Sequence, residues 1–326
     1  MGEFTLRRTR RNVRLISRSF PAQAILTRKV LSSIPLRNIL ITAVMSAGKS
    51  TLINAITGSE ICQTQNGACT SKIHFISNES YEYASGISAG ESDEDAESLH
   101  VCFRSNLSDN YRYCLIDTPG VNSSTHPEHK KLTYKAIEQL KYDFVIYVIN
   151  GSYIGVDDDI AHIQYISKHV PSNKILFVVN KLDNYRPESD SIPNAIEEIK
   201  SMLVSMGIKK PKIFPMSAYS ALLAKKYIFH ENMPRREIRE LEAMIANFIG
   251  DDVNLSLFGY SLRPPSTSHH IINHEELDID AECYMLLEYS GLMNLEDYLG
   301  SANISPVSQH CSESDPLNLR EFFWGK

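Results

Sequence analysis

Cysteine is sparse in this chain of 326 residues, and no CxxC pair or other close spacing of thiols occurs. The six cysteines are scattered along the chain: Cys62, Cys69, Cys102, Cys114, Cys283 and Cys311. This usage argues against a disulfide scaffold and favours a reducing compartment, so we expect a cytoplasmic protein. No apolar run approaches the ~18–20 residues that a membrane-spanning helix needs. Any membrane contact is therefore expected to be peripheral.

The charge is divided unevenly along the chain. The net charge is −6, yet residues 1–37 carry nine basic side chains and a single acid, Glu3, which gives +8 there and −14 in the remainder. A solvated leading helix lying against the acidic body is the explanation we favour. Binding to anionic lipid or nucleic acid, and a transit peptide, are the alternatives. We assign residues 1–33 to a basic N-terminal arm.

Short apolar runs alternate with amphipathic stretches after residue 34. The runs at residues 36–44, 113–116, 144–149, 175–179 and 212–215 are typical of buried strands. A helix is predicted over residues 49–56, and others are indicated by apolar side chains at helical spacing before Gly207 and Gly250. This alternation predicts an α/β fold with a mainly parallel sheet and helices on both faces. Ligands bind such sheets at the carboxyl ends of the strands.

Three segments interrupt this pattern. Residues 78–98 hold five acids between Glu91 and Glu97, which indicates an exposed, mobile insertion. Residues 262–275 contain two prolines and three histidines and are expected to form a loop. Residues 301–326 are polar until their last few positions and are predicted to be a C-terminal tail.

The most informative motif joins the first predicted strand to the first predicted helix. It runs Ala43-Val44-Met45-Ser46-Ala47-Gly48-Lys49-Ser50-Thr51 and matches the P-loop pattern, with alanine in place of the first glycine. Backbone N–H groups at a helix N-terminus bind phosphate oxygens, and Gly48 lets the backbone approach them. Lys49 is predicted to reach the β- and γ-phosphates and Ser50 to ligate Mg²⁺. Because Lys49 would serve phosphate alone, Lys49→Ala is expected to lose nucleotide binding and remain folded.

A second motif, Asp117-Thr118-Pro119-Gly120, directly follows the predicted strand at residues 113–116. A carboxylate at that strand end can hold Mg²⁺ through its water shell, and the Gly120 N–H can contact the γ-phosphate. Thr70, between the two motifs, is the candidate that would complete Mg²⁺ coordination. The metal ligands are therefore predicted to be Ser50, Thr70 and Asp117.

A third motif, Asn180-Lys181-Leu182-Asp183, selects the base. Guanine presents N1–H and an exocyclic amine side by side, and one carboxylate, that of Asp183, can accept both hydrogen bonds. Adenine has an acceptor at N1, so a site built on these bonds rejects it strongly. Asn180 would brace the loop, and the stem of Lys181 would cover the base. Ser217 and Ala218 follow the last predicted strand, where a backbone N–H can donate to guanine O6.

Together these motifs resemble the GTPase domain of the dynamin family, including bacterial dynamin-like proteins. Ser46 stands three residues before Lys49 as in that family, and Thr70 lies 21 residues after Lys49. The resemblance extends to the segment around Ser290-Gly291-Leu292 and implies a GTPase domain over residues 34–300. It also implies GTP hydrolysis stimulated by dimerisation of G domains. A monovalent cation, K⁺ or Na⁺, held by Ser46 and backbone near Gly67 would then act in catalysis.

The sequence departs from that family in three respects. Val121 follows the second motif, and Met45 occupies the place where many members have a water-orienting glutamine. Nothing in the chain corresponds to the long stalk, which implies a fragment, a shortened relative or a stalk-bearing partner. The catalytic residues predicted are Ser46, Lys49, Thr70 and Gly120.

Three functions follow from these residues. The one we favour is Mg²⁺-dependent GTP hydrolysis by a homodimerising G domain, with a peripheral membrane surface as a further contact. The second is a slow GTP switch that serves as a platform for partners. The third, ranked last because no RNA-binding domain is recognisable, is an Era-like GTPase acting on RNA; nucleic acid is therefore not an expected partner.

Overall fold

The computed structural model describes residues 34–62, 71–79, 88–92, 95–121, 127–153, 155, 157–185, 190–262 and 278–301. Within these residues eight strands form one sheet in the order β3-β4-β2-β5-β1-β6-β7-β8. The strands are β1 (Leu36–Ala43), β2 (Ile73–Asn78), β3 (Ser88–Ser92), β4 (Ala96–Val101), β5 (Arg112–Asp117), β6 (Phe144–Asn150), β7 (Ile175–Asn180) and β8 (Lys212–Pro215). The sheet is mainly parallel, as predicted, but β2–β5 and β3–β4 are antiparallel pairs.

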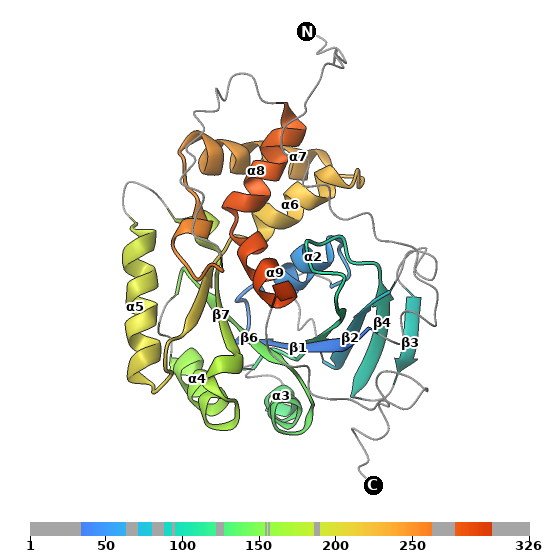
Figure 1. The fold of residues 1–326 in the computed structure, drawn as a ribbon, viewed down its shortest axis with the longest axis vertical. Coiled ribbons are helices and arrows are strands. Elements are labelled where there is room, and N and C mark those ends of the chain that lie inside the picture. Colours follow the sequence, from blue (N-terminus) through green and yellow to red (C-terminus); the bar gives the residue numbers. More distant parts are fainter. Residues whose placement is uncertain are drawn as a thin grey trace.

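Helices cover both faces of this sheet. They are α2 (Lys49–Thr57), α3 (Pro127–Gln139), α4 (Asp157–His169), α5 (Ile192–Ser205), α6 (Ala218–Ile228), α7 (Arg235–Ile245), α8 (Ile279–Tyr289) and α9 (Leu292–Ser301). Helices α3, α4 and α5 lie on one side of the sheet, and α2, α6 and α9 on the other (Figure 1). α7 and α8 pack outside α6, so the described chain has a second helical layer on that side (Figure 1).

The central strands are apolar because they are buried from both sides. Strands β1, β6 and β7 have almost no exposed side chain, which explains their continuous apolar sequences. Two of these strands end at predicted binding motifs. β1 ends at the P-loop, and β7 ends directly before Lys181 and Asp183. The predicted strands and the helix at residues 49–56 are thus confirmed, with small shifts of their ends.

The prediction that the acidic segment at residues 78–98 is an exposed insertion is wrong for the part that the structure describes as strands; residues 80–87 and 93–94 lie outside the described residues. The segment contains β3 and the first half of β4, and Ala96 is fully buried. β4 pairs in parallel with β2 and β3 pairs with β4, so this segment extends the sheet at one edge. An edge strand tolerates charged residues because part of its surface is exposed to water. Acidic composition therefore did not distinguish these strands from an exposed insertion. Most of the loop predicted at residues 262–275 and nearly all of the tail lie outside the described residues.

Candidate nucleotide-binding site

The P-loop turns sharply between β1 and α2. Gly48 is the N-cap of α2 and has φ of 91°, a conformation that favours glycine. A Cβ atom at Gly48 would lie 2.3 Å from Asn180 Nδ2, so the third motif as well as a phosphate excludes a side chain there. Ser46 also has positive φ, 62°. The loop and first helical turn contain the predicted binding residues Met45, Ser46, Ala47, Gly48, Lys49, Ser50 and Thr51.

Lys49 contacts the carboxylate of Asp117, which lies at the end of β5. Lys49 Nζ donates a hydrogen bond to Asp117 Oδ1, and both side chains are almost wholly buried. Burial alone would raise the pKa of Asp117, but the charge and hydrogen bond of Lys49, together with the nearby His74, hold it below its ordinary value. Lys49 is therefore tied to the core, and the expectation that its side chain serves phosphate alone is wrong.

The residues at the end of β5 and the start of α2 fit a magnesium ion. Asp117 Oδ2 is buried and lies 3.8 Å from His74 Nδ1, too far for a hydrogen bond, so an ionised oxygen is available to a metal or its water. Ser50 lies half-buried in the first turn of α2. Thr70, the third predicted ligand, lies outside the described residues, as does the backbone near Gly67.

The segment after β5 is bound to the P-loop. Thr118 Oγ1 donates to the carbonyl of Ile41 at 3.0 Å. Val121 and the P-loop exchange hydrogen bonds, Val121 N to the Ala43 carbonyl and Met45 N to the Val121 carbonyl, both 3.2 Å. A Cβ at Gly120 would lie 3.3 Å from Met45 Cγ, so Gly120 also allows close approach of the two segments.

The third motif is joined both to the P-loop and to the start of α6. Asn180 Nδ2 donates to the Ala47 carbonyl at 3.1 Å, and Asn180 Oδ1 accepts from Ala218 N at 3.0 Å. Ser217 Oγ donates to Asp183 Oδ1 at 2.7 Å. Asn180 thus braces the loop as predicted, and Ser217 orients the carboxylate assigned to guanine.

These segments enclose one pocket. Its lining consists of Gly48, Thr51, Asn180, Lys181, Asp183, Asn184 and Tyr219. Lys181 adopts φ of 66°, and its Cε lies 3.7 Å from the place of a Cβ on Gly48, so its stem runs beside the P-loop. The pocket is therefore lined both by phosphate-binding residues and by base-reading residues, which are ~130 positions apart in the sequence.

Two residues near the site were missed by sequence reasoning. His74 lies opposite Asp117 in the antiparallel β2–β5 register, with its Nδ1 3.8 Å from Asp117 Oδ2. Tyr219 lines the pocket from the first turn of α6. Tyr219 could have been suspected from its place directly after Ser217-Ala218, whereas His74 depends on a strand pairing that the sequence did not indicate.

Comparison with known families gives one match over about two thirds of the chain. The model of the family described as the elongation factor Tu GTP binding domain matches residues 34–251. Helices α8 and α9 lie beyond the matched residues.

Two curated relatives are GTPase Era from Actinobacillus pleuropneumoniae, serotype 5b (strain L20) and serotype 7 (strain AP76). Each is 22% identical over 197 residues, which is 60% of this chain and 52% of the relative. The chain thus spans about half the length of the curated relatives it matches.

Among solved structures, Era in complex with MgGDPNP and nucleotides 1506–1542 of 16S ribosomal RNA is similar with 15% identity and a TM-score of 0.40. That match covers 62% of this chain and 59% of the other. A structure of the chloroplast translocon components atToc33 and psToc159 gives 14% identity and a TM-score of 0.41, with 57% and 72% coverage.

The dynamin resemblance is wrong. The family match and the curated relatives point instead to a translation-factor-like G domain, with GTPase Era as a named relative. The P-loop serine and the spacing to Thr70, which suggested dynamin, are short local signals, whereas the family match extends over two thirds of the chain. The monovalent cation and the stalk-bearing partner were implied only by that resemblance, and they have no remaining support.

No helix within the described ranges is both long and apolar enough to cross a bilayer. The fold is an α/β P-loop G domain with a mostly parallel sheet. Its P-loop and its Asn180–Asp183 segment line one pocket, and Asp117 is joined to the P-loop helix through Lys49. The chain belongs to the family of the elongation factor Tu GTP-binding domain.

Proposed function

We propose that the chain binds Mg²⁺–GTP and hydrolyses it slowly, as a GTP-controlled switch of the Era type. The observation that carries the proposal is the pocket lined by both Gly48 of the P-loop and Asp183 of the base-reading segment. Ser217 Oγ holds the Asp183 carboxylate at 2.7 Å, and this carboxylate can accept hydrogen bonds from the N1–H and the exocyclic amine of guanine. Adenine has an acceptor at N1 and cannot make this pair of bonds. The curated relatives named GTPase Era support the same activity.

The residues of the chain supply positioning and positive charge. Lys49 and the P-loop amides would bind the phosphates, and Asp117 and Ser50 would hold Mg²⁺, with Thr70 as the sequence-based third ligand. Bound Mg²⁺ would neutralise charge that develops on the phosphate oxygens. Met45 and Val121 place apolar side chains beside Gly120, so neither orients an attacking water. We therefore expect turnover on the order of 10⁻⁴ to 10⁻² s⁻¹, as in GTPases without an added arginine.

Single-turnover GTP hydrolysis tests this activity. Lys49→Ala should abolish binding and hydrolysis, while Lys200→Ala, an exposed lysine paired with Glu197, should leave both unchanged. Lys49→Ala also leaves Asp117 without its ion pair, which can destabilise the protein. The unfolding of this variant is therefore measured in parallel, and the assays are run under conditions in which the variant is folded. Hydrolysis by Lys49→Ala at the wild-type rate would contradict the proposal.

Protein concentration is varied in the same assay. A rate per molecule that stays constant is expected of a switch acting as a monomer. A rate that rises with concentration would instead favour activation by dimerisation of G domains.

A second proposal is that RNA is a partner. Its specific support is the charge of +7 on residues 1–33, eight basic side chains against Glu3, since clustered arginine and lysine bind phosphate backbones. The relatives named GTPase Era are consistent with it, and one solved Era structure contains 16S ribosomal RNA. RNA thus replaces the solvated leading helix as the interpretation we favour for the basic arm.

Filter binding to a ribosomal RNA fragment over a salt series tests this partner. Replacing Arg7, Arg8, Arg10 and Arg11 by glutamine should weaken binding and reduce the salt slope by about 0.7 for each phosphate that is no longer neutralised. Unchanged binding and slope would contradict the role of the arm. Preferential binding of the wild type to anionic vesicles over RNA would contradict the choice of RNA.

A further inference from the structure

Tyr219 forms part of the pocket wall, although no motif includes it. It is the second residue of α6, directly after Ala218, whose backbone N–H is bound by Asn180 at 3.0 Å. Ser217 caps this helix by accepting a hydrogen bond from Ser220 N at 3.2 Å. The first turn of α6, which carries Tyr219, is therefore fixed to the base-reading segment.

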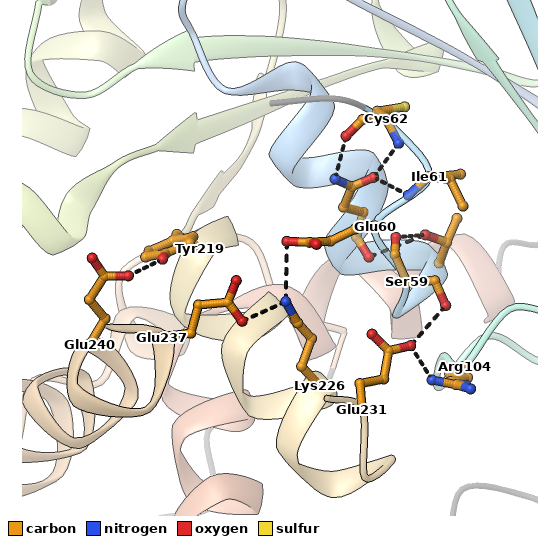
Figure 2. Close-up of polar contacts among 12 residues, drawn as sticks. Ser59, Glu60, Ile61, Cys62, Arg104, Tyr219, Lys226, Glu231, Glu237 and Glu240 are labelled. Carbon is orange, nitrogen blue, oxygen red and sulfur yellow. Dashed lines mark hydrogen bonds and ion pairs between the residues drawn. The ribbon is translucent and has the colours of Figure 1, made fainter. Parts of the chain in front are cut away.

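The hydroxyl of Tyr219 is directed toward Glu240 of α7 (Figure 2). It donates a hydrogen bond to Glu240 Oε2, and Arg236 Nε donates to Glu240 Oε1 at 2.8 Å. These two bonds, that of Tyr219 first, lower the pKa of the Glu240 carboxyl. Glu240 is thus a charged acceptor that holds the outer end of the tyrosine while the ring remains in the pocket wall.

We propose that Tyr219 is a nucleotide-contacting residue whose ring packs against the guanosine part of the bound nucleotide, and that Glu240 and Arg236 are positioning residues for that ring. The inference rests on the proposed GTP site and deepens it. Tyr219 is the only aromatic side chain among the described residues that line the pocket. An aromatic ring adds a flat apolar surface for the base or ribose.

The anchoring of the hydroxyl explains why tyrosine suits this position. A tyrosine side chain on a helix surface samples several rotamers, and ordering it on ligand binding costs free energy. The bond to Glu240 orders the ring before the nucleotide arrives. Phenylalanine would offer the same face and lose this preorganisation, whereas alanine would lose both.

The experiment compares two probes, GDP and inorganic tripolyphosphate, which has no base. Calorimetry with GDP should show Tyr219→Ala binding about ten- to a hundredfold more weakly, the range for removing one aromatic ring that stacks on a base. Tripolyphosphate should bind Tyr219→Ala and wild type equally, because the P-loop is untouched. Tyr219→Phe should lose GDP affinity by a smaller factor than Tyr219→Ala.

Two further variants separate positioning from packing. Glu240→Ala should weaken GDP binding as much as Tyr219→Phe does. The double variant Tyr219→Phe with Glu240→Ala should bind GDP no more weakly than either single variant, because both substitutions remove the same hydrogen bond. Tyr165→Phe is the matched control, because Tyr165 of α4 donates to Glu138 of α3 in the same way but does not line the pocket. It should bind GDP as the wild type does.

The outcomes distinguish this inference from the proposed function. Equal loss of GDP and tripolyphosphate affinity in Tyr219→Ala would show a structural role only and would overturn the proposal. Unchanged GDP affinity in Tyr219→Ala would overturn it as well, with the GTP site intact. Absence of GDP binding to the wild type would instead overturn the proposed function.

Discussion

The carboxylate of Asp183 carries the base selectivity of the pocket at the scale of single residues. Its Oδ1 is held by Ser217 Oγ at 2.7 Å, so its orientation is fixed before a base arrives. Asp183→Asn should reduce GTP affinity by at least about a hundredfold, since an amide cannot accept both guanine hydrogen bonds. Xanthine carries a carbonyl in place of the exocyclic amine, and the new amide can donate to it.

Competition binding with GTP and XTP measures this change. The variant should prefer XTP and the wild type GTP. Equal GTP affinity in variant and wild type would refute the assignment of Asp183 to the base. Asp190→Asn serves as a control of the same chemistry on an exposed residue.

His162 gives a prediction on pH that does not involve the nucleotide. It is buried on α4, bonds Thr42 Oγ1 through Nε2 at 2.9 Å, and stacks beside Tyr134. Burial, with a smaller contribution from the charge of Lys130, lowers its pKa from 6.5 to about 3. Between these values the unfolded chain binds a proton that the folded chain does not, so stability is lost as pH falls.

Urea unfolding at about pH 7, 6 and 5 tests this direction. His162 is expected to lower the free energy of unfolding by about 1.4 kcal/mol for each pH unit below 6.5. His162→Gln, which keeps an amide near Thr42, should show a shallower decline over the same range. An equally steep decline in the variant would mean that other groups control acid stability.

At the scale of elements, a buried ion pair joins α6 to α9. Lys225 Nζ lies 2.7 Å from Glu296 Oε1, and both side chains have 0% exposure. Lys225 also donates to the Ile56 carbonyl in α2, and Glu296 Oε2 accepts from Asn106 N. The pair thus fastens α9 to the helix that begins at the P-loop.

Glu296→Gln should lower the free energy of unfolding by about 3–5 kcal/mol, because it leaves the Lys225 charge buried without a counter-charge. Adding Lys225→Met to this variant should recover much of the loss, since the remaining amide can still accept from Asn106. Urea unfolding of the full chain measures both. A double variant no more stable than Glu296→Gln would show that packing, and not charge, dominates here.

Most elements that end at the site could be predicted from sequence, and those at the sheet edge could not. β1, β6 and β7 are buried on both faces and are therefore continuous apolar runs. β3 and β4 contain acidic and small residues, and they are strands because β4 pairs with β2 and β3 pairs with β4. The place of Tyr219 at the pocket could have been inferred from its neighbours Ser217-Ala218, but its contact with Glu240 depends on where α7 packs.

At the scale of the whole molecule, local motifs indicated the chemistry better than the family. The P-loop, Asp117 and Asn180–Asp183 segments were predicted to lie together because each follows a strand of a parallel sheet, and the structure joins them through Lys49–Asp117 and Asn180–Ala47 contacts. The dynamin assignment relied on a serine and a spacing, which long-range comparison outweighs. Lys49 likewise pairs with a buried residue, Asp117, that the linear motif did not predict as its partner.

Titration calorimetry of the full chain with GDP and with ADP, each with Mg²⁺, tests the central claim most directly. We predict heat from one GDP per chain and no measurable binding of ADP, because the carboxylate of Asp183 meets donors on guanine and an acceptor on adenine. No heat with GDP, or equal affinity for the two nucleotides, would contradict this claim.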